Sequence, residues 1–249
     1  MRPALRLGRK NREARRALCL GALIMRGGFE QVVQEMEQEA VRDTHRSLVA
    51  DLEDWLRQTK LARDQSPCER ILFGKTLGAW PRQDVVDVSW RSEELGVFQW
   101  ALGHAGEMPA WDTKFRQDRV MPPLALFGNP QVYEQASALR PRAELEQMQS
   151  IALLWHWRSR TTQLQHRGDV EPPANLTFEE IIASTAVGAY EAGELPEPLD
   201  EDFPAFGKPY AELDEDEYAL ATSIATERHL ALNWLCEPGT PWDETPTDT

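Results

Sequence analysis

Several charged residues fall on helical faces that are otherwise apolar, and their side chains are of the types that bind ions or transfer protons. In residues 89–103, Arg91 shares a predicted face with Leu95, and Glu93 shares another face with Val97. Successive residues of an α-helix turn by about 100°, so Arg91 and Glu93 point about 200° apart and cannot pair with each other. A buried charge without a partner costs several kcal/mol. Both side chains therefore need partners from other helices.

The same pattern recurs in two further predicted helices. Arg158 follows Trp155 by three positions, and Glu227 interrupts an apolar stripe near the end of the chain. The sequence thus predicts a polar network or anion pocket formed by Arg91, Glu93, Arg158, Arg160, Glu227, Arg228 and Asp243. Two interpretations are open. The set is either a group of buried ion pairs that fixes helix register, or a pocket for an anion or for acid–base chemistry.

Signatures of other chemistries are missing from the sequence. It contains no GxSxG, HExxH, GxxxxGK[ST] or GxGxxG motif, and its five histidines lack the spacing of metal ligands. Cys19, Cys68 and Cys236 lie far apart and form no CxxC pair, which favours a reducing compartment. We therefore expect no metal site, no cofactor and no enzymatic activity.

Charge is unevenly distributed along the chain. The formal net charge is −14, yet residues 1–26 carry eight Arg and Lys and only one acid. Acids concentrate in residues 191–217, where Lys208 is the only base. Such a surface repels nucleic acid and anionic membranes and attracts a basic protein, although a solvated loop is the plainer interpretation. The candidate partner-binding residues are Glu197, Asp200, Glu201, Asp202, Glu212, Asp214, Glu215, Asp216 and Glu217.

The start of the chain superficially resembles a signal peptide, with basic residues followed by the apolar run 17–25. This run has nine residues and precedes Arg26, so it is too short to span a bilayer and lacks a cleavage site. We expect a folded amphipathic helix and a cytoplasmic protein. A basic arm that contacts RNA or membrane is a weaker alternative.

Helical periodicity dominates the sequence and predicts an all-α fold. Residues 104–130 are expected to form mostly loop, Thr177 and Glu180 form a capping box, and no strand pattern is convincing. The expected helices cover residues 11–26, 29–60, 67–73, 84–103, 142–165, 177–190 and 214–235. We expect one compact multi-helix domain over 1–249, with a long helical segment at 27–60, an extended acidic, proline-rich excursion at 191–213 and an ordered tail at 236–249. In the tail, Trp242 should fill an apolar hollow, while Asp243 or Asp248 neutralises an arginine such as Arg91 or Arg158.

Short motifs spread along the chain carry a resemblance. They include Arg15-Arg16-Ala17-Leu18 after Arg12, Trp90-Arg91-x-Glu93 leading to Trp100-Ala101-Leu102-Gly103, His156-Trp157 with Arg160, and Glu227-Arg228-His229 leading to Asn233-Trp234-Leu235. Over residues 11–249 these motifs resemble a bacterial family catalogued as domain of unknown function 4272. Residues 202–210 resemble an insertion found in a subset of such proteins. The resemblance implies a compact helical protein and supplies no reaction and no catalytic residue.

Two hypotheses for function follow from charge and motifs. The first is a non-catalytic, protein-binding protein, best specified as a bacterial immunity protein that neutralises a toxin delivered by a secretion system. A nuclease toxin has a basic groove that the acidic segment would complement. The second is an enzyme or small-molecule sensor that uses the Arg/Glu set as an anion pocket.

Overall fold

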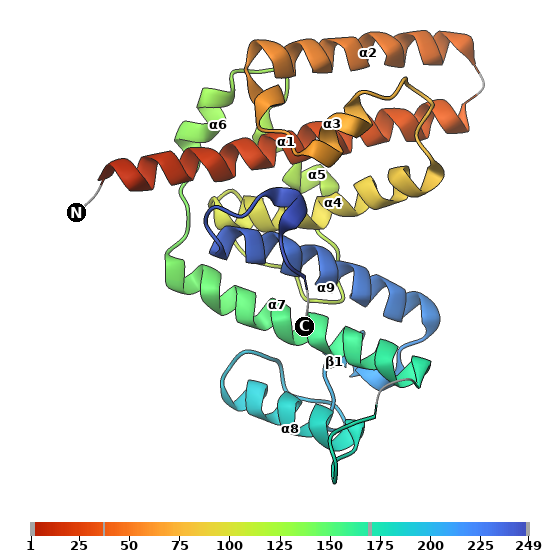
Figure 1. The fold of residues 1–249 in the computed structure, drawn as a ribbon, viewed down its shortest axis with the longest axis vertical. Coiled ribbons are helices and arrows are strands. Elements are labelled where there is room, and N and C mark those ends of the chain that lie inside the picture. Colours follow the sequence, from red (N-terminus) through yellow and green to blue (C-terminus); the bar gives the residue numbers. More distant parts are fainter. Residues whose placement is uncertain (1–2, 37, 169–170, 248–249) are drawn as a thin grey trace. The chain divides into compact units, whose positions relative to one another are not determined.

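The computed structural model describes residues 3–36, 38–168 and 171–247, with side chains from residue 12 onward (Figure 1). Helices dominate, which confirms the expected all-α class. In the described part of the chain, strands are limited to the two-residue β1 (Pro204–Ala205) and β2 (Lys208–Pro209). None of the described helices has the length and apolarity needed to cross a membrane.

The chain divides into two compact units that interleave in sequence. The first unit comprises Met1–Met108, Phe115–Arg140 and Gly239–Thr245, and the second comprises Pro109–Lys114, Pro141–Pro238 and Pro246–Thr249. The expectation of a single domain over 1–249 stays a prediction.

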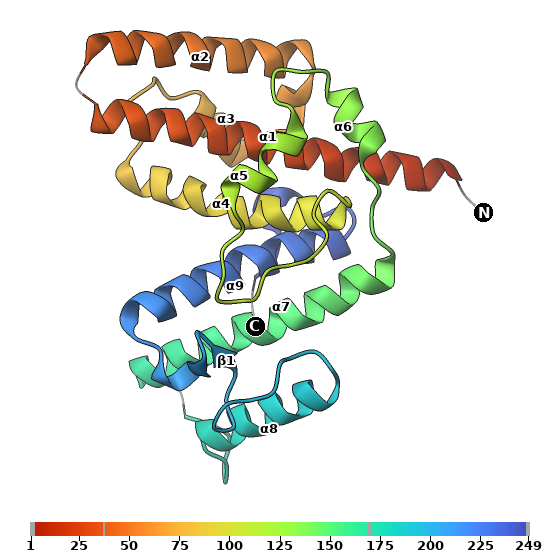
Figure 2. The same ribbon diagram turned by 180° about the vertical axis from the view of Figure 1, so that it is seen from behind.

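In the first unit, α1 (Pro3–Glu35) lies between α2 (Glu39–Gln58) and α4 (Arg82–Ala101), as both ribbon views show (Figures 1 and 2). Its central residues are buried almost all round, because neighbouring helices cover several of its faces. The apolar run 17–25 is therefore the middle of a buried helix. Short elements complete the unit: η1 (Leu61–Arg63), α3 (Pro67–Phe73), α5 (Gln117–Val120), η2 (Pro122–Leu124), α6 (Pro130–Ala136) and η4 (Trp242–Glu244).

The predicted break between the first two helices is in the wrong place. Gly27 and Gly28 lie inside α1, and the chain turns between Glu35 and Glu39 instead. A Cβ atom on Gly27 would come within 2.7 Å of a methyl carbon of Val88 on α4. This glycine permits close packing of two helices, and its helix-breaking tendency is overridden by the packing it allows.

The second unit consists mainly of α7 (Arg142–Arg167) packed along α9 (Glu215–Cys236), with α8 (Phe178–Glu191) and η3 (Tyr210–Glu212) at the side of this pair. Aromatic rings form its centre. Trp155 stacks on Trp111 with ring centroids 6.1 Å apart, and the edge of Phe203 meets Trp155 at 5.4 Å. Capping boxes at Thr177 and Asp214 begin α8 and α9.

The acidic segment 191–213 is largely irregular, and two tight turns organise it. Leu199 and Asp202 exchange backbone hydrogen bonds around a tight turn, and β1 pairs antiparallel with β2 around a second one. Phe203 and Tyr210, which flank the hairpin, are 0 and 2 % exposed. These two aromatic side chains anchor the segment in the core of the second unit.

The described part of the tail, residues 236–247, is ordered, as expected, and Trp242 is buried. Its ring lies 5.9 Å from that of Phe98, with the guanidinium of Arg16 4.9 Å from the ring centre. Asp243 accepts a hydrogen bond of 2.9 Å from the backbone N–H of Cys68 in the first turn of α3. The predicted role of Asp243 as counter-ion of Arg91 or Arg158 is replaced by this capping contact, whereas Asp248 lies outside the described residues.

Candidate functional site

Arg158 lies in the core of the second unit, where its partner is Asp202. The Nε and Nη2 atoms of Arg158 each donate to the Asp202 carboxylate at 2.6 Å, and Nη1 donates to Thr162 at 2.5 Å. Both members of the ion pair are almost fully buried. All three nitrogens have acceptors inside the protein and the side chain is 1 % exposed, so this arginine is not accessible to an external anion.

Arg228 is fully buried and donates to backbone carbonyls. Its Nη1 donates to the carbonyl oxygens of Pro109 and Ala110 at 2.9 and 3.2 Å, and its Nη2 donates to that of Thr113 at 2.7 Å. The guanidinium also lies 5.2 Å from the centre of the Trp111 ring. Arg228 therefore holds the loop of residues 109–114 within the second unit.

The charged residues of α4 have local and backbone partners. Arg91 pairs with Glu94 one turn along the helix, and the carboxylate of Glu93 accepts a 2.8 Å hydrogen bond from the backbone N–H of Phe115. Glu93 and Glu94 are both 0 % exposed, whereas the Arg91 side chain is 30 % exposed. Of these three, Arg91 is the one that reaches a surface.

Arg160 and Glu227 complete the predicted set. Arg160 is exposed and donates to Gln163 on its own helix, while Glu227 is half-buried on α9. The contacts of Arg158 and Arg228 fit the structural interpretation of this set.

Seven of the nine candidate partner-binding acids are exposed: Glu197, Asp200, Glu201, Glu212, Asp214, Glu215 and Asp216. Asp202 is buried against Arg158, so its assignment to a partner-binding surface is wrong. Glu217 is half-buried and pairs with Lys208 at 2.6 Å, which neutralises the only base of residues 191–217. The exposed surface of this segment is thus uniformly acidic.

Part of this segment also has a structural role at the start of α9. Asp214 is the N-cap of the helix, and Glu215, Asp216 and Glu217 occupy its first turn. Carboxylates there interact favourably with the positive end of the helix dipole. Glu197, Asp200, Glu201 and Glu212 lie outside that turn, so helix capping does not explain them.

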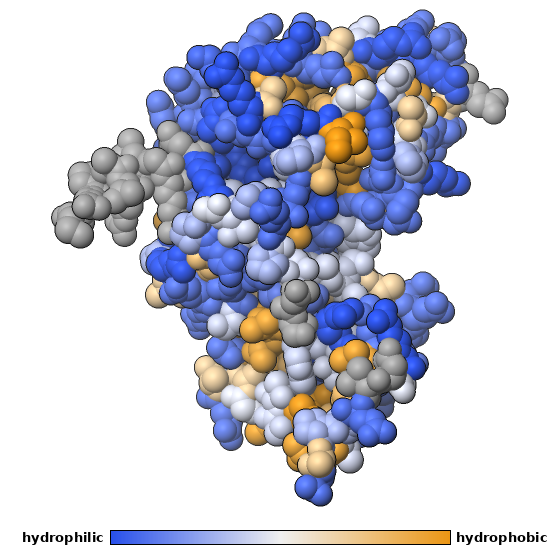
Figure 3. All heavy atoms as spheres, viewed as in Figure 1, coloured by the Kyte–Doolittle hydropathy of each residue, from blue (hydrophilic) through white to orange (hydrophobic). Residues whose placement is uncertain are grey.

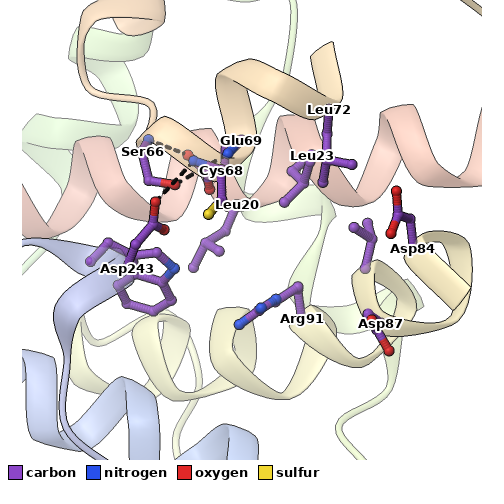
Figure 4. Close-up of a pocket in the computed structure, with 12 residues that line it drawn as sticks. Leu20, Leu23, Ser66, Cys68, Glu69, Leu72, Asp84, Asp87, Arg91 and Asp243 are labelled. Atoms are coloured by element: carbon purple, nitrogen blue, oxygen red, sulfur yellow. Dashed lines mark hydrogen bonds between the residues drawn. The ribbon is translucent and has the colours of Figure 1, made fainter. Parts of the chain in front are cut away.

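A hollow of about 140 Å³ opens in the first unit between α1, α3, α4 and the chain end (Figure 4). Its apolar lining includes Leu20, Leu23, Val88 and Trp242, each buried. Polar groups surround these residues: Ser66, Cys68, Glu69, Asp84, Asp87, Arg91 and Asp243. Two members of the predicted network, Arg91 and Asp243, line this cavity.

The Cys68 thiol is poorly suited to act as a nucleophile. A hydrogen bond to Asp243 raises its pKa, and partial burial acts in the same direction. Burial opposes ionisation of Asp243, but hydrogen bonds from Cys68 and Ser66 outweigh it and lower the pKa of that carboxyl. At neutral pH this pair is a thiol beside a carboxylate, the opposite of the thiolate that cysteine catalysis uses.

Several structurally important charges escaped prediction. Arg16 pairs with Glu69, and Arg26 pairs with Glu30 at 2.7 Å, in a segment interpreted only as an amphipathic helix. All four side chains are buried. The available signal was the position of arginines at the two ends of the apolar run 17–25, similar to the signal that singled out Arg91.

A buried histidine pair in the second unit was also missed. The rings of His156 and His229 stack with centroids 4.7 Å apart, and Asn233 donates to His229. Burial, followed by the neighbouring His156, lowers the pKa of His229 to about 4. The pair is therefore held in an environment that disfavours the charged ring.

A family model described as Domain of unknown function (DUF4272) matches residues 6–179. The chain belongs to this family. The match includes most of the helices of the first unit and α7, and it ends as α8 begins, so the motifs of residues 227–235 lie outside it. Comparison with curated proteins gave no match, and comparison with solved structures gave none.

Proposed function

We propose that the protein is a non-catalytic binding protein whose acidic segment docks on a basic partner protein. The observation that carries this proposal is the exposure of seven carboxylates within residues 197–216, on the turns beside the β1–β2 hairpin and at the start of α9. Because aromatic anchors and the Arg158–Asp202 pair fix the segment, less conformational entropy is lost on docking than with a flexible tail.

Exposed apolar side chains accompany these acids. Val187 and Tyr190 lie one turn apart on α8 and are 42 and 46 % exposed, and Leu199 immediately precedes the acidic turn of Asp200 and Glu201. Hydrophilic and hydrophobic residues are mixed over this part of the surface in the space-filling view (Figure 3). Protein interfaces combine a small aromatic or apolar centre with a charged rim, and charge complementarity speeds association.

Within this class we propose an immunity protein that neutralises a bacterial toxin, with a nuclease as one candidate toxin. A nuclease presents a cationic groove for the phosphate backbone, and an array of carboxylates competes for that groove. The alternative of an anion-binding enzyme or sensor is less favoured. Arg158 and Arg228 are occupied by internal acceptors, and Arg91 shares its cavity with four carboxylates.

The test begins with purification of the tagged protein from its native host and identification of any stoichiometric partner by mass spectrometry. A basic protein that is toxic alone and harmless when co-expressed is the expected result. Kinetics would then be measured for a triple variant, Asp200→Asn, Glu201→Gln and Glu212→Gln. We expect its association rate at low salt to fall by about tenfold or more.

A matched control removes the same charge elsewhere. Glu39, Asp43 and Asp51 are exposed acids at the start and middle of α2 in the first unit, and their neutralisation should change the association rate by less than about twofold. Equal losses in the two triple variants would show that only net charge matters. That result would show that the acidic segment is not the docking site.

A further inference from the structure

The hollow beside α3 is of a size that selects its ligand. Its volume is about 140 Å³, well below the roughly 300–1,000 Å³ of sites for drug-sized ligands. An apolar protein cavity of roughly 150 Å³ holds one molecule of about the size of benzene. The hollow therefore fits a ligand of about five or six heavy atoms, or a single side chain of a larger molecule.

The apolar lining requires a hydrocarbon part in the ligand. Leu20, Leu23 and Val88 are at most 3 % exposed, and they line the hollow from α1 and α4. Figure 4 shows Leu23 and Leu72 facing this space from two helices, with Arg91 crossing it on the side of α4. Contact with these side chains favours an alkyl segment over a fully polar ligand.

The charged side chains around the hollow determine whether the ligand is a cation or an anion. Glu69 is neutralised by Arg16, Asp84 by Lys75 at 2.6 Å, and Arg91 pairs with Glu94. Within the described part of the chain, the other two lining carboxylates, Asp87 and Asp243, have no ion-pair partner. The hollow thus carries a net charge of about −2, and an anion would meet repulsion there.

We propose that this hollow binds a primary ammonium group at the end of a short alkyl chain. The alkyl part lies on Leu20, Leu23 and Val88, and the ammonium lies at the rim, within the field of Asp87 and Asp243. The chemistry is that of a free alkylamine and of a lysine side chain alike. It rests on the first unit alone and does not depend on the acidic segment of the second.

The test is a titration of the full chain with three small probes of matched size and one capped lysine, monitored by amide and indole NMR shifts. The probes are butylammonium, butanol, butyrate and Nα-acetyl-lysine-N-methylamide. We expect butylammonium to bind with a Kd on the order of 1–10 mM, which suits a ligand of five heavy atoms. It should shift the Trp242 indole and bind at least about fivefold tighter than butanol.

Two substitutions locate the effect. Asp87→Asn and Asp243→Asn should each weaken butylammonium binding by about threefold or more, and the asparagine oxygen at 243 still accepts the Cys68 N–H bond that caps α3. Asp51→Asn, which changes an exposed acid of α2, should have no effect. Equal affinity for butanol, tighter binding of butyrate, or no saturable binding of any probe would each overturn the proposal.

The lysine probe distinguishes the two sources of the ammonium. Binding of the capped lysine with the affinity of butylammonium would assign the hollow to a side chain of a partner protein. Binding of butylammonium alone would assign it to a small amine. If the triple variant of the acidic segment binds its partner unchanged, the proposed function fails. The amine-binding results for the hollow would still stand, since the two sites share no residue.

Discussion

The ion pair between Arg158 and Asp202 gives the sharpest test of how the acidic segment is held in place. The Asp202 carboxylate accepts four hydrogen bonds: two from Arg158 at 2.6 Å, and one each from the backbone N–H groups of Phe203 at 2.7 Å and Ala211 at 2.9 Å. Substitution Asp202→Asn replaces one acceptor oxygen with an NH₂ group that faces these donors. It also leaves the Arg158 guanidinium buried without a counter-ion.

The expected loss is large because the remaining charge cannot reach water. Removal of one partner from a buried ion pair costs about 3–5 kcal/mol. In a chain of this length each kcal/mol lowers Tm by about 2–4 °C, so Tm should fall by roughly 6–20 °C. The adjacent and exposed Glu201 is the matched control, and Glu201→Gln should cost less than about 0.5 kcal/mol.

The assay is urea unfolding followed by far-UV circular dichroism and by tryptophan fluorescence, since Trp155 lies against Phe203 in the same core. A double variant, Arg158→Met with Asp202→Asn, removes the orphaned charge. It should be more stable than Asp202→Asn alone by about 1–3 kcal/mol. If the free energy of unfolding of Asp202→Asn lies within 0.5 kcal/mol of that of the parent chain, this pair does not anchor the segment and the reasoning is refuted.

Three further predictions concern other parts of the molecule. Trp242→Ala should lower the free energy of unfolding by about 2–3 kcal/mol. It should also speed hydrogen exchange of the Cys68 amide, which donates a hydrogen bond to Asp243, and mass spectrometry or NMR would detect this change. Lys60 is exposed with φ 63° just after α2, so Lys60→Gly should raise the free energy of unfolding, measured in urea, by up to about 1 kcal/mol, whereas Lys60→Ala should not. Because the fold lowers the pKa of His229 from 6.5 to about 4, stability should be full above pH 6.5 and decline as the pH falls towards 4. Thermal unfolding across that range should show the decline, and His229→Gln should largely remove it.

Two helices were well predicted from local signals at their starts. The capping box at Thr177 predicted a helix over 177–190, and α8 runs from Phe178 to Glu191. Pro67 predicted the start of α3. By contrast, α6 was missed although Asn129 caps it and Pro130 lies in its first turn, because its seven residues carry too little apolar periodicity to support these signals. A local signal at the start of a short helix was therefore used in one case and overlooked in the other.

The hollow of the first unit could not be predicted from local sequence. Its lining comes from residues 20–23, 66–72, 84–91 and 242–243, which meet only when α1, α3, α4 and the chain end pack together. Nothing in the sequence distinguishes Asp87 from other surface acids. For the same reason Asp202 was grouped with exposed acids. Its burial follows from the turn that brings it to Arg158, and a run of acids carries no sign of that turn.

The buried arginines show why a network built only by pairing basic with acidic residues is incomplete. A guanidinium has five N–H donors and accepts no proton, so a carbonyl oxygen satisfies it as readily as a carboxylate does. Arg228 uses three loop carbonyls. Arg26 donates to the Lys75 carbonyl while Glu30 accepts the Gly78 N–H, so that this ion pair on α1 fixes a loop that has little regular structure of its own. An arginine on an apolar helical face therefore indicates a partner that is either an acid or a loop carbonyl. The loops held here are those before α4 and between residues 109 and 114.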